Sequence, residues 1–207
     1  MNNLTFKQYR NIDLLIFTAL LVCSETITSY ATNIWFDKQA VAISTTLIFI
    51  CIIIMRWNWL AIIPALVGGL VVSIVAQITL PDFSSELFLI NTLGNCFALG
   101  SLVWFKIFKQ EDIRKGPFKL FFFVATAYIL LHVGRWLVSL CFGYDPTAIV
   151  RYLGRDSVSL LFTAVVMLLM KNSEGMLENQ KAYLFRLQRE REEKAKEDFP
   201  EIYPNND

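Results

Sequence analysis

The chain of 207 residues lacks most of the features by which an enzyme or a nucleic-acid-binding protein is identified from its sequence. Its net charge is only +1, and its charges form no basic surface for nucleic acid. It contains no Gly-rich phosphate loop, no HExxH, no GxSxG and no paired-carboxylate motif. We therefore predict that the chain is not an enzyme and has no catalytic residue, and that any ATP-driven process must draw on a partner.

Potential metal ligands are equally scarce. The chain has one histidine, His132, and four cysteines that stand singly in apolar runs without a CxxC pair. One histidine cannot build a zinc site of the usual kind, and isolated cysteines in apolar runs are typical of small buried hydrophobic residues. We expect no metal site, no disulfide framework and no cofactor in this chain.

Apolar residues are what the sequence has in abundance. They make up 55% of the chain, the mean hydropathy is +0.47, and there are 17 phenylalanines. A helix needs about 20 apolar residues to cross a bilayer core. No Ala-x-Ala cleavage site accompanies the first apolar run, so we expect it to be retained as a span. The sequence predicts an all-α membrane protein with six transmembrane helices, at about 13–31, 39–55, 60–79, 86–105, 118–141 and 147–170.

The distribution of basic residues predicts the orientation of these spans. Lys7, Arg10 and Arg56, together with five basic residues between spans four and five, lie on one side, whereas Asp37, Lys38, Asp82, Glu86 and Asp145 lie in the opposite links. Because Lys and Arg favour the cytoplasmic side, both termini are predicted to be cytoplasmic. We divide the chain into a membrane domain, 1–171, and a cytoplasmic part, 172–207, with a charged helix over 174–198 and a disordered tail.

Polar residues gather at one depth of the predicted bundle. With a rise of about 1.5 Å per residue, His132 and Arg135 lie about 21 and 26 Å along span five, in its outer third. Arg151 and Arg155 lie about 6 and 12 Å below the outer surface in span six. Asn91 and Asn95 of span four and Glu25 of span one reach a similar depth, while the inner half is almost purely apolar.

Ionisable residues at membrane depth are expected to face a protein interior or a water-filled cavity. Three arginines and a histidine against Glu25 and Asp156 leave an excess of positive charge, which an anionic ligand would balance. We expect an outward-facing pocket in which Arg135 and Arg155 hold the anion. The supporting residues are predicted to be His132, Arg151, Asn91, Asn95 and Glu25, with Trp35 and Trp136 as walls.

Each of these residues also has a structural interpretation. Arg135 and Arg155 would form internal ion pairs with Glu25 or Asp156, and Arg151 would extend to the headgroups. His132 would be a hydrogen-bonded core residue, and the two asparagines would join neighbouring helices. Glu25 would alternatively be a proton-coupling carboxylate, although no second carboxylate at its depth forms a relay with it.

The opening stretch "YRNIDLLIFTALLVCSETITSYATNIWF" (9–36) resembles the first helix and following link of the substrate-binding S components of energy-coupling factor (ECF) transporters with unassigned ligands. The likeness in size and span layout covers about 5–171. It implies import of a vitamin-like nutrient across the bacterial cell membrane, with ligand held at the outer ends of helices four to six and by the link after helix one. It also implies a transmembrane coupling subunit, two cytoplasmic ATPase subunits and toppling of the loaded subunit. The small residues that meet the coupling subunit would be Ala19 and Cys23, where Cys23 departs from the usual alanine.

Two other functions remain open on the sequence. The chain would be a structural scaffold subunit in cell-shape or envelope assembly if the polar cluster only joins helices. It would be a membrane enzyme acting on a lipid phosphate if the basic cluster binds a headgroup and Glu25 takes part in turnover.

Overall fold

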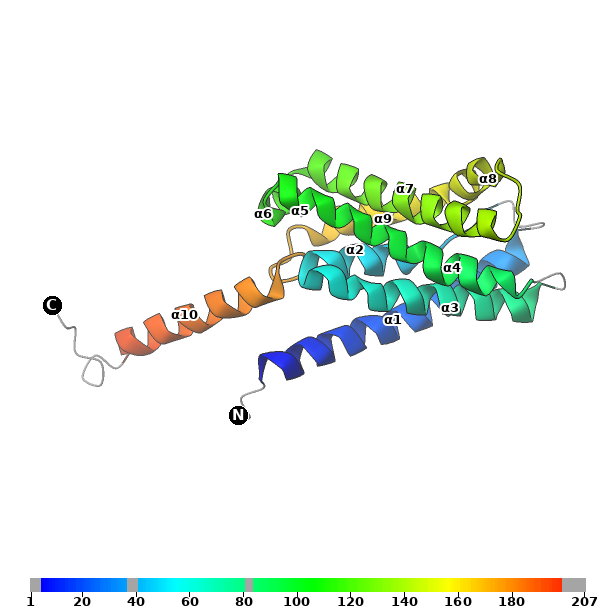
Figure 1. Cartoon of the computed structure of the whole chain (residues 1–207). Coiled ribbons are helices and arrows are strands. Elements are labelled where there is room, and N and C mark those ends of the chain that lie inside the picture. The colour runs from blue at the N-terminus through cyan, green and yellow to red at the C-terminus, as the bar shows by residue number, and fades with distance from the viewer. Residues whose placement is uncertain (1–4, 37–40, 81–83, 199–207) are drawn as a thin grey trace.

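The computed structural model describes residues 5–36, 41–80 and 84–198, and this part of the chain is helical and contains no strand (Figure 1). Predictions made for Asp37, Lys38, Asp82 and the tail 199–207 lie outside the described residues. The elements in chain order are α1 (Phe6–Trp35), α2 (Thr46–Trp57), η2 (Asn58–Ala61), α3 (Ile62–Thr79), α4 (Glu86–Cys96), η3 (Phe97–Val103), α5 (Trp104–Ile107), α6 (Gln110–Lys115), α7 (Pro117–Cys141), α8 (Ala148–Arg155), α9 (Ser157–Met170) and α10 (Gln180–Asp198).

Several of these helices, singly or as continuous runs of elements, have the length and apolar character of membrane spans. Within the described ranges, four helical stretches are long and apolar enough to cross a membrane: α1, Thr46–Thr79, Glu86–Ile107 and α7. The pair α8 and α9 meets the same criterion together, with a bend of 43° between them. The prediction of an all-helical fold with several helices long and apolar enough to cross a membrane is confirmed for the described residues.

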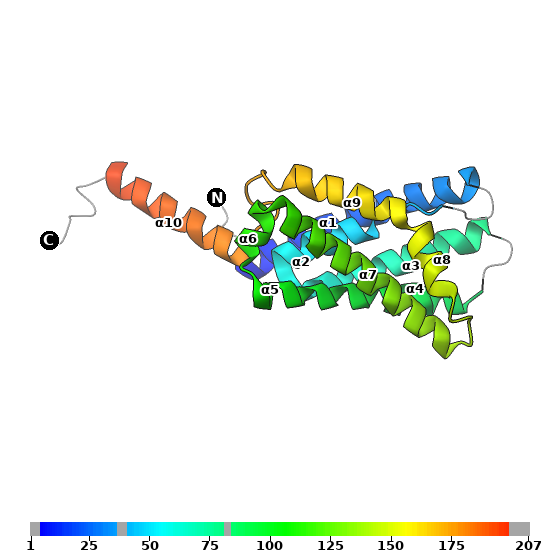
Figure 2. The ribbon, with the colours of Figure 1, turned by 90° about the horizontal axis from the view of Figure 1, so that it is seen from above.

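The helices form an elongated bundle with two distinct ends (Figures 1 and 2). We call the end where α1 begins and α9 finishes the basal end, and the end where α1 finishes and α4 begins the distal end. The helix α10 extends away from the bundle at the basal end. The charged helix predicted from residue 174 begins at Gln180, because residues 171–179 instead form turns.

The core of the bundle is the short helix α2. Eleven of its twelve residues are buried, so α2 is an inner helix surrounded by others. The span expected at 39–55 is therefore wrong in its start, since residues 41–45 are not helical. At about 18 Å, α2 is too short to cross a bilayer core by itself. The chain then reverses at Asn58, which has a φ of +53°, and returns as α3.

Glycines allow the helices around α2 to approach closely. A Cβ at Gly69 of α3 would come within 2.6 Å of the Thr92 Cα in α4, and one at Gly94 within 2.6 Å of the Arg135 Cα in α7. A Cβ at Gly134 would likewise clash with the Gly94 carbonyl oxygen. These contacts bring α3, α4 and α7 together and fix where Arg135 enters the bundle.

Candidate functional site

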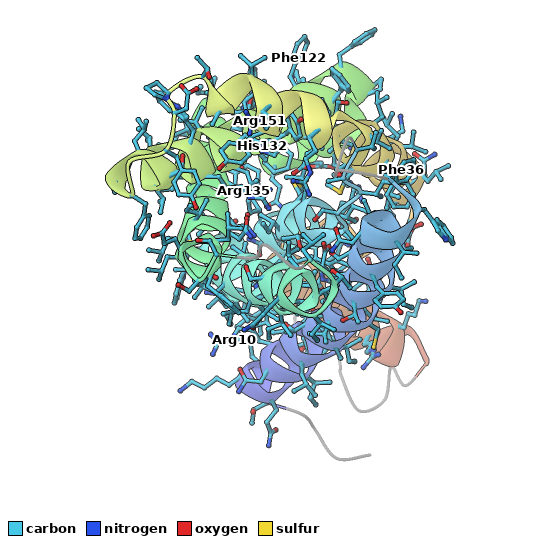
Figure 3. All side chains as sticks on the ribbon, turned by 90° about the vertical axis from the view of Figure 1, so that its right-hand side faces the viewer. Arg10, Phe36, Phe122, His132, Arg135 and Arg151 are labelled. Carbon is cyan, nitrogen blue, oxygen red and sulfur yellow. The ribbon has the colours of Figure 1, made fainter. Side chains whose placement is uncertain are left out.

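A cavity of about 120 Å³ opens at the distal end, beside the N-terminus of α2. The helix α2 begins only at Thr46, so the chain beside the cavity consists of the non-helical residues 41–45. We call these residues the strap. The cavity is lined by residues of α1, the strap, α3, α4, α7 and α8. Figure 3 views the bundle from this end and shows Arg135 and His132 within the ring of helices.

Glu25 of α1 lies at the inner side of this cavity and is completely buried. Its carboxylate accepts hydrogen bonds from the backbone N–H groups of Thr45 (2.7 Å) and Thr46 (2.8 Å), and from the hydroxyls of Ser29, Ser44 and Thr45. An anion at a helix N-terminus satisfies orphan N–H groups and interacts favourably with the helix dipole. Glu25 therefore acts as the cap of α2, supplied by another helix.

Arg135 of α7 lies at the centre of a buried polar network. Its Nη1 donates to Asp156 Oδ2 at 2.9 Å, and its Nε donates to Asn95 Oδ1 at 2.9 Å. The Asn95 amide donates in turn to the Ala65 carbonyl. His132 Nε2 lies 3.6 Å from the same Asp156 oxygen. This network inside the bundle joins α3, α4 and α7 to the bend between α8 and α9.

The strap closes one side of the cavity and is attached to α8 and α9. The backbone N–H of Ala42 donates to the Arg155 carbonyl at 2.9 Å, and the N–H of Ser44 donates to Ser159 Oγ at 2.8 Å. The side chain of Arg155 lines the cavity together with Tyr152. Since Asp156 stands at the 43° bend that follows Arg155, this break turns two charged neighbours toward the cavity.

The structure brings some of the predicted site residues together and leaves others apart. Four of them line the cavity, and Asn95 and His132 contact this group from behind. Three predicted residues are not among its lining: Arg151 is exposed, Trp35 is 77% exposed, and the Trp136 indole donates to the Pro146 carbonyl. Ala19 and Cys23 are exposed on the outer face of α1. The predicted residues that line the cavity are Glu25, Asn91, Arg135 and Arg155.

Sequence reasoning assigned Asp156 only as a counter-charge and did not include it among the site residues, although both Arg135 and His132 approach its Oδ2. Its position directly after Arg155 was the available signal. The strap was missed as well, because hydropathy placed 39–55 in one span. Ser44 in particular lines the cavity from a stretch that was expected to be helix.

The cavity has a mixed electrostatic character. Two arginines and two carboxylates, Glu25 and Asp156, are among its described lining residues, so the expected excess of positive charge is not found there. The Glu25 carboxylate is already surrounded by donors, and one Nη of Arg135 donates to Asp156. Arg155, Asn91 and Tyr152 bring further polar groups to the lining.

This arrangement suits a small polar ligand with an anionic group, and equally a network that joins helices. Comparison of the chain with protein-family models, with curated proteins and with solved structures finds no match.

Proposed function

We propose that the chain is a substrate-binding membrane subunit of an ATP-driven importer, resembling the S components of ECF transporters. The observation that supports this most is the cavity at the distal end, where two arginines and two carboxylates gather among largely apolar helices. Charged groups at membrane depth carry an insertion penalty of about 2.5–3.5 kcal/mol each, and a ligand-binding role accounts for keeping several together.

The ligand in this proposal is a small anionic nutrient of the vitamin type. Guanidinium groups bind carboxylate or phosphate through paired hydrogen bonds, which assigns the anion to the side of the cavity formed by Arg135 and Arg155. Ligand pockets usually measure about 300–1,000 Å³. A cavity of about 120 Å³ admits a molecule of few atoms or the anionic end of a larger one.

The remaining parts of the proposal concern topology and partners. Six traverses of the bacterial cell membrane, with both termini in the cytoplasm, accord with the reversal of the chain at Asn58 if the strap and α2 together form one pass and α3 the next. A transmembrane coupling subunit would contact α1 at Ala19 and Cys23, where small exposed side chains permit close helix packing. Two cytoplasmic ATPase subunits would supply the energy, because no nucleotide-binding motif is present in this chain.

The decisive experiment is mass spectrometry of small molecules released from the detergent-purified protein. We expect one anionic compound at close to one copy per chain. In Arg155→Gln its occupancy should fall about tenfold or more, because a hydrogen bond to a charged group contributes about 1.5–3 kcal/mol.

Arg151→Gln is the matched control, since Arg151 lies one turn away on α8, is exposed and is not among the lining residues. It should retain the compound in full. Equal loss in both variants, or release of lipids alone from the wild-type protein, would contradict the proposal.

A structural scaffold subunit is the second candidate, and the closed network of Arg135, Asp156 and Asn95 favours it. In that case Arg135→Gln would destabilise the protein and Arg135→Gln/Asp156→Asn would recover part of the loss, because the double variant leaves no unpaired buried charge. The same variants would show no difference in bound small molecules.

A further inference from the structure

The links at the basal end contain a cluster of basic residues to which the proposed function assigns no role. The span formed by α4, η3 and α5 ends at Ile107, the link carries α6, and α7 starts at Pro117. We call residues 104–119 the basal hairpin. It carries three lysines, Lys106, Lys109 and Lys119, for which no ion pair is found among the described residues.

The two sides of the basal hairpin are held in register by aromatic contacts. The Phe105 and Phe123 rings stack with their centroids 5.9 Å apart, and the Trp104 indole donates to Thr126 Oγ1 at 3.1 Å. Lys119 lies one turn from Phe123 toward the basal end, which brings it near the end of α5. Lys106 is in the last turn of α5, so these two lysines lie at similar depth.

An aromatic column supports the charged groups. The rings of Trp104 and Phe108 stack at 5.4 Å, and the Lys119 Nζ lies 4.8 Å from the Phe108 ring centroid. Beside them, Ile107 is 67% exposed and Phe118 is 79% exposed. A fixed ammonium group above aromatic rings, with exposed apolar side chains next to it, matches the border between headgroups and acyl chains.

The part of the link that forms α6 is anchored to the rest of the protein. Ile113 of α6 is completely buried, the Gln110 amide donates to the Met55 carbonyl, and Arg114 pairs with Glu178. Of the two acidic residues, Glu111 is paired with Lys115 at 2.6 Å. The second, Asp112, offsets one of the three lysine charges. The basal hairpin therefore keeps a net positive charge.

We propose that the basal hairpin binds the headgroup of an anionic phospholipid in the leaflet at the basal end. Lys106, Lys109 and Lys119 contact the phosphate and any second anionic group of the headgroup. Ile107 and Phe118 lie against the acyl chains. This site is separate from the distal cavity and does not depend on the identity of its ligand.

The test is native mass spectrometry of the full chain in detergent, titrated with phosphatidylglycerol or with phosphatidylcholine of the same acyl chains. A lysine near an anionic surface strengthens binding about fivefold. Because two of the three lysine charges remain after Asp112 is counted, we expect the first phosphatidylglycerol to bind about 25-fold more tightly than phosphatidylcholine. The triple variant Lys106→Gln/Lys109→Gln/Lys119→Gln should reduce this preference to less than about twofold, and the triple Lys→Arg variant should keep it.

The matched control removes three charges from the described, exposed part of α10, which extends away from the bundle. This control should keep the full preference for phosphatidylglycerol. Equal preference in the glutamine hairpin variant, or equal loss in the control, would overturn the proposal. Displacement of phosphatidylglycerol by excess inorganic phosphate would also overturn it, because a soluble anion would then be the ligand. The control variant is Lys181→Gln/Arg189→Gln/Lys194→Gln.

Discussion

Single buried charges determine where the helices of this chain start and how they meet. Glu25 receives hydrogen bonds at the N-terminus of α2, and Asp156 receives the guanidinium of Arg135. Each carboxylate joins segments that are far apart in the sequence. A carboxylate in such a place is compensated by donors and helix dipoles, and removing its charge leaves those donors unsatisfied in an apolar interior.

Glu25→Gln is therefore expected to destabilise the protein by about 2–3 kcal/mol, because the glutamine amide cannot accept all the hydrogen bonds that the carboxylate accepts. Thermal unfolding in detergent measures this as a lower midpoint. Thr26→Val, at the next and exposed position of α1, serves as control and should change the midpoint little. An unchanged midpoint in Glu25→Gln would refute the capping role of this residue.

At the scale of elements, close helix packing places the cavity. Gly94 and Gly134 let α4 and α7 touch along their backbones, and the Arg135 Cα lies at this crossing. The Arg135 guanidinium then reaches both Asn95 on α4 and Asp156 beyond α8. A larger residue at the crossing would move α7 away from α4 and separate Arg135 from Asn95.

We expect Gly134→Ala to destabilise the protein by about 1–3 kcal/mol, as is typical of overpacking in a tight interface. Gly154 of α8 is the matched control, since a Cβ there would meet nothing within 4 Å. Gly154→Ala should be neutral or stabilise by up to about 1 kcal/mol, because alanine favours helix more than glycine. Similar unfolding midpoints for the two variants would contradict the close packing of α4 against α7 at Gly134.

On the scale of the whole molecule, α2 connects the distal cavity to the basal end. Glu25 binds its first turn, and at its last turn Arg56 is paired with Asp13 at 2.6 Å. The same guanidinium donates to the carbonyls of Gly175 and Met176, next to the completely buried Leu177. The segment that precedes α10 is thus fixed to the core of the bundle through the C-terminal end of α2.

Arg56→Gln should release this segment while the helices of the bundle remain assembled. Because breaking a buried ion pair costs about 3–5 kcal/mol, limited proteolysis between residues 171 and 180 should become about tenfold faster or more. Arg189→Gln on the exposed part of α10 should leave the cleavage rate as in the wild-type protein. Cleavage at the same rate in Arg56→Gln would mean that Leu177 alone holds the segment.

Hydropathy and spacing were sufficient to predict the helical class and several helices long and apolar enough to cross a membrane. These follow from local quantities, since the apolar length of a segment and the rise per residue are set by the chain itself.

Only the tertiary structure decided that α2 starts at Thr46, that residues 41–45 form the strap and that Asp156 pairs with Arg135. A carboxylate of one helix caps a second helix only when tertiary packing brings the two helices together. Hydropathy is a local property of the sequence, so it does not predict that contact. For the same reason Arg151 and Arg155, equal in residue type and four apart, have different surroundings: the bend at Asp156 and the strap determine which of them faces the cavity.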